Sequence, residues 1–283
     1  MTIEPARLSF AEDGTPYSGE FGDVYHSRGG GLEQARFVFL GGNRLPERWH
    51  DRDAFTIVET GFGLGLNFLA TWAAWRDDER RCDRLHFVSV ERHPFRRDDL
   101  ATLHARWPEL VPLAAELQAH WPVLTPGIHR LHLDGGRVIL TLLLGDAPDL
   151  IPELQCRADA FYLDGFSPAT NPDLWSAGLL HELSRLAAPG ATLATWSVTG
   201  AVRRALGELG FRCERAAGFG GKRQMLRARF GDAGDAAAAA SPRHALVIGA
   251  GLAGSSIANR LAERGWTVDV VDAAAGPAQG ASG

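Results

Sequence analysis

Short apolar runs alternate with amphipathic stretches along the first 230 residues, a pattern that predicts strands and helices in turn. The apolar positions between 66 and 75 fall on one helical face, and Pro94 is expected to open the following helix. Because parallel strands need such crossovers, the order predicts a mainly parallel sheet. The runs interpreted as its buried strands are 56–60, 86–91, 160–163 and 191–196, the last after a turn at Pro189-Gly190.

Two further pairs of runs predict antiparallel strands. Residues 128–133 and 137–144 flank Asp134-Gly135-Gly136, which is typical of a hairpin, here ending at Gly145-Asp146. Residues 211–216 and 224–230 flank a glycine-rich turn and would close the sheet. The expected fold class is therefore α/β, with the Rossmann-like sheet of class I methyltransferases and an antiparallel last strand.

A small, alanine-rich stretch divides the chain. Residues 231–243 are low in complexity and are interpreted as a linker between a domain at 1–230 and a segment at 244–283. In that segment, a strand, a glycine loop, a helix and a second strand predict one βαβ unit. About forty residues follow the linker, too few for an independent core, so we expect an incomplete domain there.

Composition narrows the possible partners. The net charge of −5 argues against a long nucleic-acid-binding surface, so any RNA contact has to be local. No apolar run has membrane-spanning length, and the first residues do not form a secretory signal. Three widely spaced cysteines, Cys82, Cys156 and Cys213, argue against a disulfide framework or a zinc site and favour the cytoplasm. We therefore expect no metal and no membrane partner.

A glycine-rich turn follows the first parallel strand. Gly61, Gly63 and Gly65 allow the backbone to turn sharply and to approach a ligand at the carboxyl end of the sheet. Their spacing differs from the dinucleotide motif, and the preceding Glu59 disfavours a phosphate and suits a cationic ligand such as S-adenosylmethionine. A turn that binds nothing is the alternative.

Two more acids follow successive strands. Glu91 ends the second strand, where it is expected to accept hydrogen bonds from the ribose hydroxyls of the same ligand. Asp146 follows the hairpin and is expected to meet the adenine amino group. Each has a simpler interpretation, Glu91 as a strand-end acid paired with Arg92 and Asp146 as a turn residue. Together with Glu59 they predict a cofactor site more strongly than any one does.

The segment 163–175 is a short loop after a buried strand. Asp164 lies at its start, glycine and prolines restrict its backbone, and Trp175 is expected to begin an apolar helix. A rigid loop that presents an acid, amides and an aromatic beside a methyl donor suits a nucleobase amine. The alternative is a proline-rich connection in which Asp164 is only a cap. Two polar-aromatic stretches, 21–25 and 41–49, either line the same pocket or cap the sheet.

The region from about Phe10 to Phe230 resembles the methyltransferase domain of the MnmC family, the bifunctional tRNA 5-methylaminomethyl-2-thiouridine biosynthesis proteins. The tail resembles the start of the FAD-dependent oxidase domain of that family, and 279–283 resembles the segment just past its dinucleotide unit. The motifs that carry the resemblance, in the family's order, are Phe21-x-Asp-x-Tyr25, Val38–Asn43, Glu59–Phe68, Leu163–Pro172 and Gly218–Leu226.

This resemblance implies that the chain uses S-adenosylmethionine to methylate the amine of 5-aminomethyl-(2-thio)uridine at the tRNA wobble position. The FAD domain of the family first removes the carboxymethyl group of 5-carboxymethylaminomethyl-uridine. Asp164 is then expected to accept the proton of the amine. Arg203 and Arg204 lie near the RNA or form a solvated helix face. The residues expected to contact the substrate are Phe166, Ser167, Pro168, Asn171, Lys222 and Arg223.

The tail carries the glycine pattern of a dinucleotide site. Gly249, Gly251 and Gly254 lie between a predicted strand and helix, and Asp272 follows 23 residues after Gly249, where it could hold a ribose. The choice of FAD over NAD rests on the resemblance. Two other functions stay open: a flavin-dependent oxidoreductase with a non-catalytic front domain, and a non-catalytic RNA-binding module. The sequence assigns no oligomeric state.

Overall fold

The computed structural model of the chain describes residues 2–231 and 243–273. The chain divides into two units, Met1–Gly234 and Asp235–Gly283, and each is described by itself. The linker predicted at 231–243 falls almost wholly outside the described residues, and the segment 279–283 falls wholly outside them.

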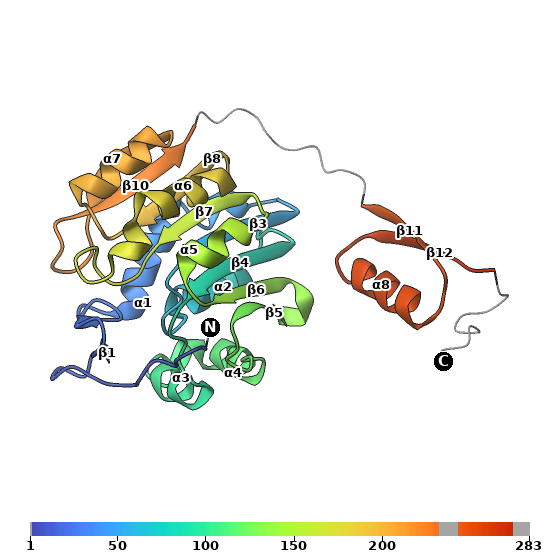
Figure 1. Cartoon of the computed structure of the whole chain (residues 1–283), viewed down its shortest axis with the longest axis horizontal. Coiled ribbons are helices and arrows are strands. Elements are labelled where there is room, and N and C mark those ends of the chain that lie inside the picture. Colours follow the sequence, from blue (N-terminus) through green and yellow to red (C-terminus); the bar gives the residue numbers. More distant parts are fainter. Residues whose placement is uncertain (1, 232–242, 274–283) are drawn as a thin grey trace. The chain divides into compact units, whose positions relative to one another are not determined.

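An eight-stranded sheet forms the centre of unit 1, in the order β5-β6-β4-β3-β7-β8-β10-β9 (Figure 1). The five strands from β6 to β8 are parallel, whereas β5 and β10 run antiparallel to their neighbours and β9 runs antiparallel to β10. The predicted fold class, with an antiparallel last strand, is confirmed. The strands are β3 (Ala54–Thr60), β4 (Arg84–Glu91), β5 (Gly127–Leu133), β6 (Val138–Leu144), β7 (Ala158–Leu163), β8 (Ala187–Thr195), β9 (Phe211–Ala217) and β10 (Gln224–Phe230).

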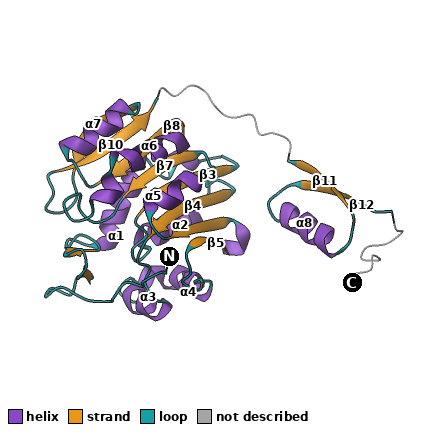
Figure 2. Cartoon of the chain, viewed as in Figure 1, coloured by secondary structure: helices purple, strands orange, loops and turns teal. Residues whose placement is uncertain are grey.

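Helices cover both faces of this sheet, so its central strands are mostly buried and largely apolar (Figure 2). Every residue of β6 is buried, and removing a large apolar side chain from water stabilises the fold by roughly 1.5–3 kcal/mol. One face carries α1 (Gly31–Gln34), the π-helical turn Ala35–Leu40, α2 (Leu66–Asp77), α3 (Arg97–His104) and α4 (Val111–Ala119). The other carries α5 (Ala147–Leu150), α6 (Ala177–Leu186) and α7 (Gly200–Glu208).

Shorter elements complete unit 1. A two-stranded antiparallel pair, β1 (Tyr17–Ser18) and β2 (Asp23–Val24), precedes α1. Single 3-10 turns lie at Gly41–Asn43, Glu47–Trp49, Pro108–Leu110, Asp134–Gly136, Ile151–Glu153 and Pro172–Trp175.

Three predicted boundaries were wrong. The helix after β4 begins at Arg97, because the carbonyl of buried Pro94 accepts a hydrogen bond from Ala6 and the chain is still extended at Arg96. Trp175 ends a 3-10 turn, and α6 begins only after Ser176, whose hydroxyl caps it. Pro189-Gly190 is no separate turn: it lies in an irregular stretch of β8, where the pairing with β7 shifts register.

The stretch 41–49 supports the sheet and does not line the cavity described below. Asn43 is fully buried, and its Nδ2 donates to the carbonyl oxygens of Phe39 and Phe161 at 2.9 and 3.2 Å. The Arg48 Nη1 donates to the Asp159 carbonyl at 3.0 Å. The bonds to Phe161 and Asp159 satisfy backbone carbonyl groups of β7. Of the two alternatives for 41–49, capping the sheet is therefore the one that the structure supports.

Unit 2 is the predicted βαβ unit. Two parallel strands, β11 (His244–Ile248) and β12 (Thr267–Val271), flank α8 (Leu252–Ala262). A Cβ placed on Gly254 would lie 1.7 Å from the carbonyl oxygen of Gly249, so this approach of helix to loop requires glycine.

Candidate active site

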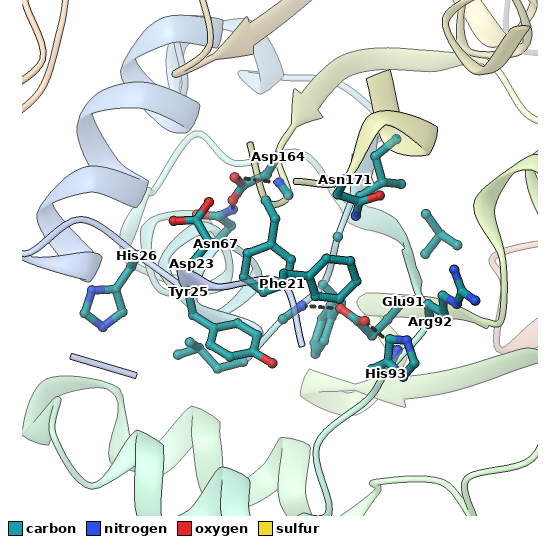
Figure 3. Close-up of a pocket in the computed structure, with 18 of the residues that line it drawn as sticks. Phe21, Asp23, Tyr25, His26, Asn67, Glu91, Arg92, His93, Asp164 and Asn171 are labelled. Atoms are coloured by element: carbon teal, nitrogen blue, oxygen red, sulfur yellow. Dashed lines mark hydrogen bonds between the residues drawn. The ribbon is translucent and has the colours of Figure 1, made fainter. Parts of the chain in front are cut away.

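A cavity of about 290 Å³ lies where the strands of unit 1 end at their carboxyl side. Residues that directly follow five strands reach its wall, and Figure 3 shows Asp164 and Asn67 toward one end of it and Glu91, Arg92 and His93 toward the other. Ligands of open α/β sheets bind at this edge. The residues that mark the strand ends are Gly61, Glu91, Gly145, Asp164 and Trp196.

The predicted glycine turn forms one wall of the cavity. Gly61, Gly63 and Gly65 have φ angles of 77°, 54° and 74°, which favour glycine. A Cβ on Gly61 would lie 3.2 Å from the Cα of Gly165, so the turn after β3 is closely packed on the loop after β7. Gly61 and Gly63 line the cavity, whereas Gly65 lies behind them as the N-cap of α2.

Two of the predicted acids face the cavity beside this turn. The carboxylate of Glu91 accepts hydrogen bonds from the backbone amides of Gly63, at 2.7 Å, and His93, at 2.8 Å. These bonds fix the side chain toward the turn. Asp146 also lines the cavity, and it is Asp146 that pairs with Arg92, at 3.1 Å.

Asp164 is held at the wall by three hydrogen bonds. Its Oδ1 accepts from the Gly165 amide at 2.8 Å and from Trp196 Nε1 at 3.0 Å, and its Oδ2 accepts from Asn67 Nδ2 at 2.8 Å. Burial raises the pKa of Asp164 to about 6, although these donors and the nearby Lys222 lower it. Its carboxyl group therefore changes charge close to neutral pH.

Glu59, predicted to contact the cofactor, does not line the cavity. It is 1% exposed, and its carboxyl group accepts from Asn67 Nδ2 at 2.9 Å and from Ser89 Oγ at 2.6 Å. The side chain points from within β3 toward α2, whereas the residues after the strand reach the cavity. Burial raises the pKa of Glu59 well above its usual range, against the effect of both donors. Glu59 thus supports Asp164 through Asn67.

Lys222 closes another part of the wall. Its Nζ lies 3.4 Å from the centre of the Trp196 ring, a cation–π contact, and Trp196 in turn donates to Asp164. Burial lowers the pKa of Lys222, and the nearby Asp164 and Asp23 act in the opposite direction. The residue as a whole is exposed, so solvent screens these effects.

Aromatic rings from the stretch 21–25 complete the cavity. Phe21 and Phe166 stack at 4.6 Å with 21° between their planes, and Tyr25 meets Phe166 edge-on at 5.1 Å. Asp23 accepts a hydrogen bond from the Ser167 amide at 3.2 Å, which ties this stretch to the loop after β7. Of the two alternatives for 21–25, lining the pocket is therefore confirmed.

The other predicted substrate residues divide into two groups. Phe166, Asn171 and Lys222 line the cavity; Ser167, Pro168 and Arg223 do not. Ser167 and Pro168 belong to the loop after β7. Arg223 follows Lys222 in the chain and is exposed. Arg203 and Arg204, on α7, are exposed too.

Two wall residues central to this geometry were not predicted. Asn67 bridges Glu59 and Asp164, and its signal was a polar residue at the second position of the helix that follows the glycine turn. Trp196 was assigned to a strand, but it lies directly after β8, the position that also places Asp164 after β7.

The set of side chains fits S-adenosylmethionine. The carboxylates of Glu91 and Asp146 line the cavity together with the glycine turn, and they suit a ligand that carries an ammonium, a sulfonium and ribose hydroxyls. Among residues 2–231 and 243–273, no group of three or more His, Cys, Asp or Glu could hold a metal ion. No helix in the same ranges is long and apolar enough to cross a membrane.

Unit 2 brings its predicted residues together at the start of α8. Gly249 and Gly251 form the loop before the helix, and Asp272, at the end of β12, accepts a hydrogen bond from the Ala250 amide at 2.5 Å. This arrangement fits the phosphate and ribose parts of a dinucleotide such as FAD.

Two family models match the chain. Residues 108–230 match the family described as S-adenosyl-L-methionine-dependent methyltransferase, and residues 244–283 match the family of FAD-dependent oxidoreductases. Both matches agree with the fold and the cofactors predicted from the sequence.

Curated relatives and a solved structure extend the comparison. The tRNA 5-methylaminomethyl-2-thiouridine biosynthesis bifunctional protein MnmC of Aromatoleum aromaticum is 73% identical over all of this chain and 45% of its own length. The protein of the same name from Azoarcus sp. is 70% identical, again over 100% of the chain and 45% of its own length. The structure of MNMC2 from Aquifex aeolicus is 26% identical, with a TM-score of 0.60, over 80% of this chain and 70% of that one. The chain thus spans about 45% of the curated relatives' length, and the resemblance predicted from its motifs is confirmed.

Proposed function

We propose, since this chain is a homologue of the MnmC proteins along its whole length, that its residues 1–230 methylate the amine of 5-aminomethyl-(2-thio)uridine at the tRNA wobble position. The product is 5-methylaminomethyl-2-thiouridine. The observation that carries the proposal is that Asp164 and the glycine turn line one cavity, where the Thr60 hydroxyl before the turn donates to the Asp164 carbonyl oxygen at 2.7 Å. One cavity can therefore hold a methyl donor and its acceptor.

The cavity offers distinct contacts for the donor. S-adenosylmethionine, when bound, supplies a methyl group made electrophilic by the neighbouring sulfonium. Glu91 is placed to accept hydrogen bonds from the ribose hydroxyls, and Asp146 to meet the adenine amino group. Gly61 and Gly63 present backbone without side chains, so a ligand can lie against it.

Asp164 acts on the acceptor amine. A primary alkylamine has a pKa of about 10.4 and is an ammonium ion at neutral pH, which has no lone pair to attack with. The Asp164 carboxylate attracts this ammonium and accepts its proton, directly or through water, as the nitrogen aligns with the methyl group. Phe21 and Phe166 offer apolar ring surface to the uracil base, and Asn171 offers its amide.

Unit 2 has a separate role in this proposal. We place a linker at 231–243 and the first part of an FAD-dependent oxidoreductase domain at 244–283. FAD, when bound, supplies the oxidising chemistry that removes the carboxymethyl group. Gly249, Gly251, Gly254 and Asp272 hold its adenosine and phosphate end.

A flavin-dependent oxidoreductase with a non-catalytic front domain is the second candidate, because residues 244–283 match that family. Flavin absorbance of the purified protein, together with failure to transfer methyl groups, would favour it.

The RNA contact is local. Lys222 and Arg223 lie in the turn between β9 and β10, and Arg203 and Arg204 are exposed on α7. We infer that these cations face the tRNA backbone while the wobble base leaves its stack to enter the cavity. The reaction belongs to the cytoplasm, where its tRNA substrate is found.

The test is methyl transfer from labelled S-adenosylmethionine to tRNA that carries 5-aminomethyl-uridine. Label should appear in 5-methylaminomethyl-uridine after nucleoside digestion. Unmodified tRNA and tRNA with 5-carboxymethylaminomethyl-uridine are the controls. Equal labelling of all three, or none of the first, contradicts the proposal.

A further inference from the structure

Two phenylalanine rings, one exposed and one half-buried, form a pair at the surface of unit 1. Phe37, in the π-helical turn after α1, is 45% exposed, and its ring centre lies 5.9 Å from that of Phe219, in the turn between β9 and β10. Their planes are inclined by 42°. The exposed part of such a pair offers flat apolar surface that water solvates poorly.

This pair adjoins the rim of the cavity. The Lys222 amide donates to the Phe219 carbonyl at 3.1 Å, so one tight turn carries both the Phe219 ring and the lysine of the cavity wall. On the other side, Gln34 lines the cavity three residues before Phe37. A Cβ on Gly29, just before α1, would lie 3.7 Å from the Phe219 ring, so the chain that leads into α1 lies against the turn between β9 and β10.

Cations neighbour both rings along the chain. Arg36 precedes Phe37, Lys222 and Arg223 follow Phe219, and all three residues are exposed. Aromatic rings among cations are how proteins bind single-stranded nucleic acid, because every base stacks on a ring and the cations meet the phosphates. A protein partner of matching apolar shape would not require these charges.

We propose that Phe37 and Phe219 form a stacking platform for the nucleobase next to the one that enters the cavity. The platform rests on the proposed function, since the base inside the cavity is taken to be the wobble uridine. A flipped nucleotide leaves its neighbours unstacked, and a ring at the rim restores that stacking to one of them. Lys222, in the same turn, then links the platform to the site of reaction.

The test separates RNA contact from chemistry. Phe37→Ala and Phe219→Ala should each raise the KM for an anticodon stem–loop with 5-aminomethyl-uridine by roughly 5- to 150-fold, the usual effect of losing one base stack. The kcat should be unchanged. The rate with the free 5-aminomethyl-uridine nucleoside, which has no neighbouring base, should also be unchanged.

Matched variants control for folding and surface loss. Phe37→Trp keeps an aromatic ring and should restore the KM, whereas Phe37→Leu keeps an apolar side chain and should not. Ile128→Ala removes a side chain that is 52% exposed on β5, at the other edge of the sheet, and should change nothing. Unchanged KM in both alanine variants overturns the platform, and so does an equal loss with stem–loop and nucleoside.

A binding measurement keeps the platform testable even if no methyl transfer is seen. Stem–loops with 2-aminopurine on either side of the wobble position report stacking through quenched fluorescence. One of the two should be quenched by the wild-type protein and not by Phe37→Ala or Phe219→Ala. Quenching that persists in both variants overturns the inference, whatever the outcome for the proposed methylation.

Discussion

Replacing Asp164 with asparagine separates recognition of the amine from binding of the methyl donor. The variant keeps the size of the side chain and removes its negative charge. Hydrogen bonds to charged groups contribute about 1.5–3 kcal/mol, so loss of the carboxylate should slow methyl transfer by roughly 10- to 150-fold. Binding of S-adenosylmethionine should survive, because Glu91 and Asp146 lie elsewhere on the wall.

The pH dependence gives a second magnitude. Burial holds the pKa of Asp164 at about 6, so about nine in ten molecules carry the charge at pH 7 and about one in ten at pH 5. The kcat/KM of the wild type should therefore fall about tenfold per pH unit below pH 6. Asp164→Asn has no carboxyl group to titrate, so the break near pH 6 should disappear, and its slower rate should rise with the fraction of free amine through pH 8.

The assay is labelled methyl transfer between pH 5 and pH 8, with calorimetry for donor binding. Asp146→Asn is the matched control, a carboxylate of the same cavity that should affect the KM for the donor and leave the acid limb in place. Unchanged turnover of Asp164→Asn at pH 7, or a break near pH 6 that persists in it, would refute the role assigned to this residue.

Three further predictions follow from the same contacts. Glu59→Gln should raise the free energy of unfolding more at pH 8 than at pH 5, because the wild type loses the stability of its neutral Glu59 carboxyl as pH rises through the raised folded pKa, whereas glutamine does not titrate. Urea unfolding that gives the same difference between variant and wild type at both pH values contradicts this. Trp196→Phe removes a donor to Asp164, so the acid limb of methyl transfer should move to higher pH, and a limb that stays or moves lower counts against that hydrogen bond. Replacing Lys222 and Arg223 with alanine should weaken tRNA binding and make log K fall less steeply with log salt, as expected for the loss of about two phosphate contacts. An unchanged slope in salt titrations excludes a role of these two residues in binding phosphates.

Local patterns were enough to predict most of the fold. Buried parallel strands are rich in apolar residues, so β3, β4 and β7 could be found from composition, and the β5–β6 hairpin from its glycine turn. Helix starts were less certain. Pro94 suits a first helical turn, but contacts with the distant N-terminal segment hold it extended, and no local signal reports such contacts.

The sequence predicted which residues form the site but not how their side chains are arranged. Acids at strand ends identified Glu91 and Asp164 because parallel strands end at one edge. Glu59 showed the limit of that argument. It lies one residue before the end of β3, and its side chain points toward α2 instead of the cavity. Asn67 and Trp196 reach Asp164 only after the sheet has formed, so their spacing along the chain gave no signal.

A crystal structure with S-adenosylhomocysteine and 5-aminomethyl-uridine is the most direct test of the shared cavity. We predict the ribose of the first ligand at Glu91 beside Gly61 and Gly63, and the amine of the second within hydrogen-bond distance of the Asp164 carboxylate. An amine bound away from Asp164, or a homocysteine ligand outside the glycine turn, contradicts the account.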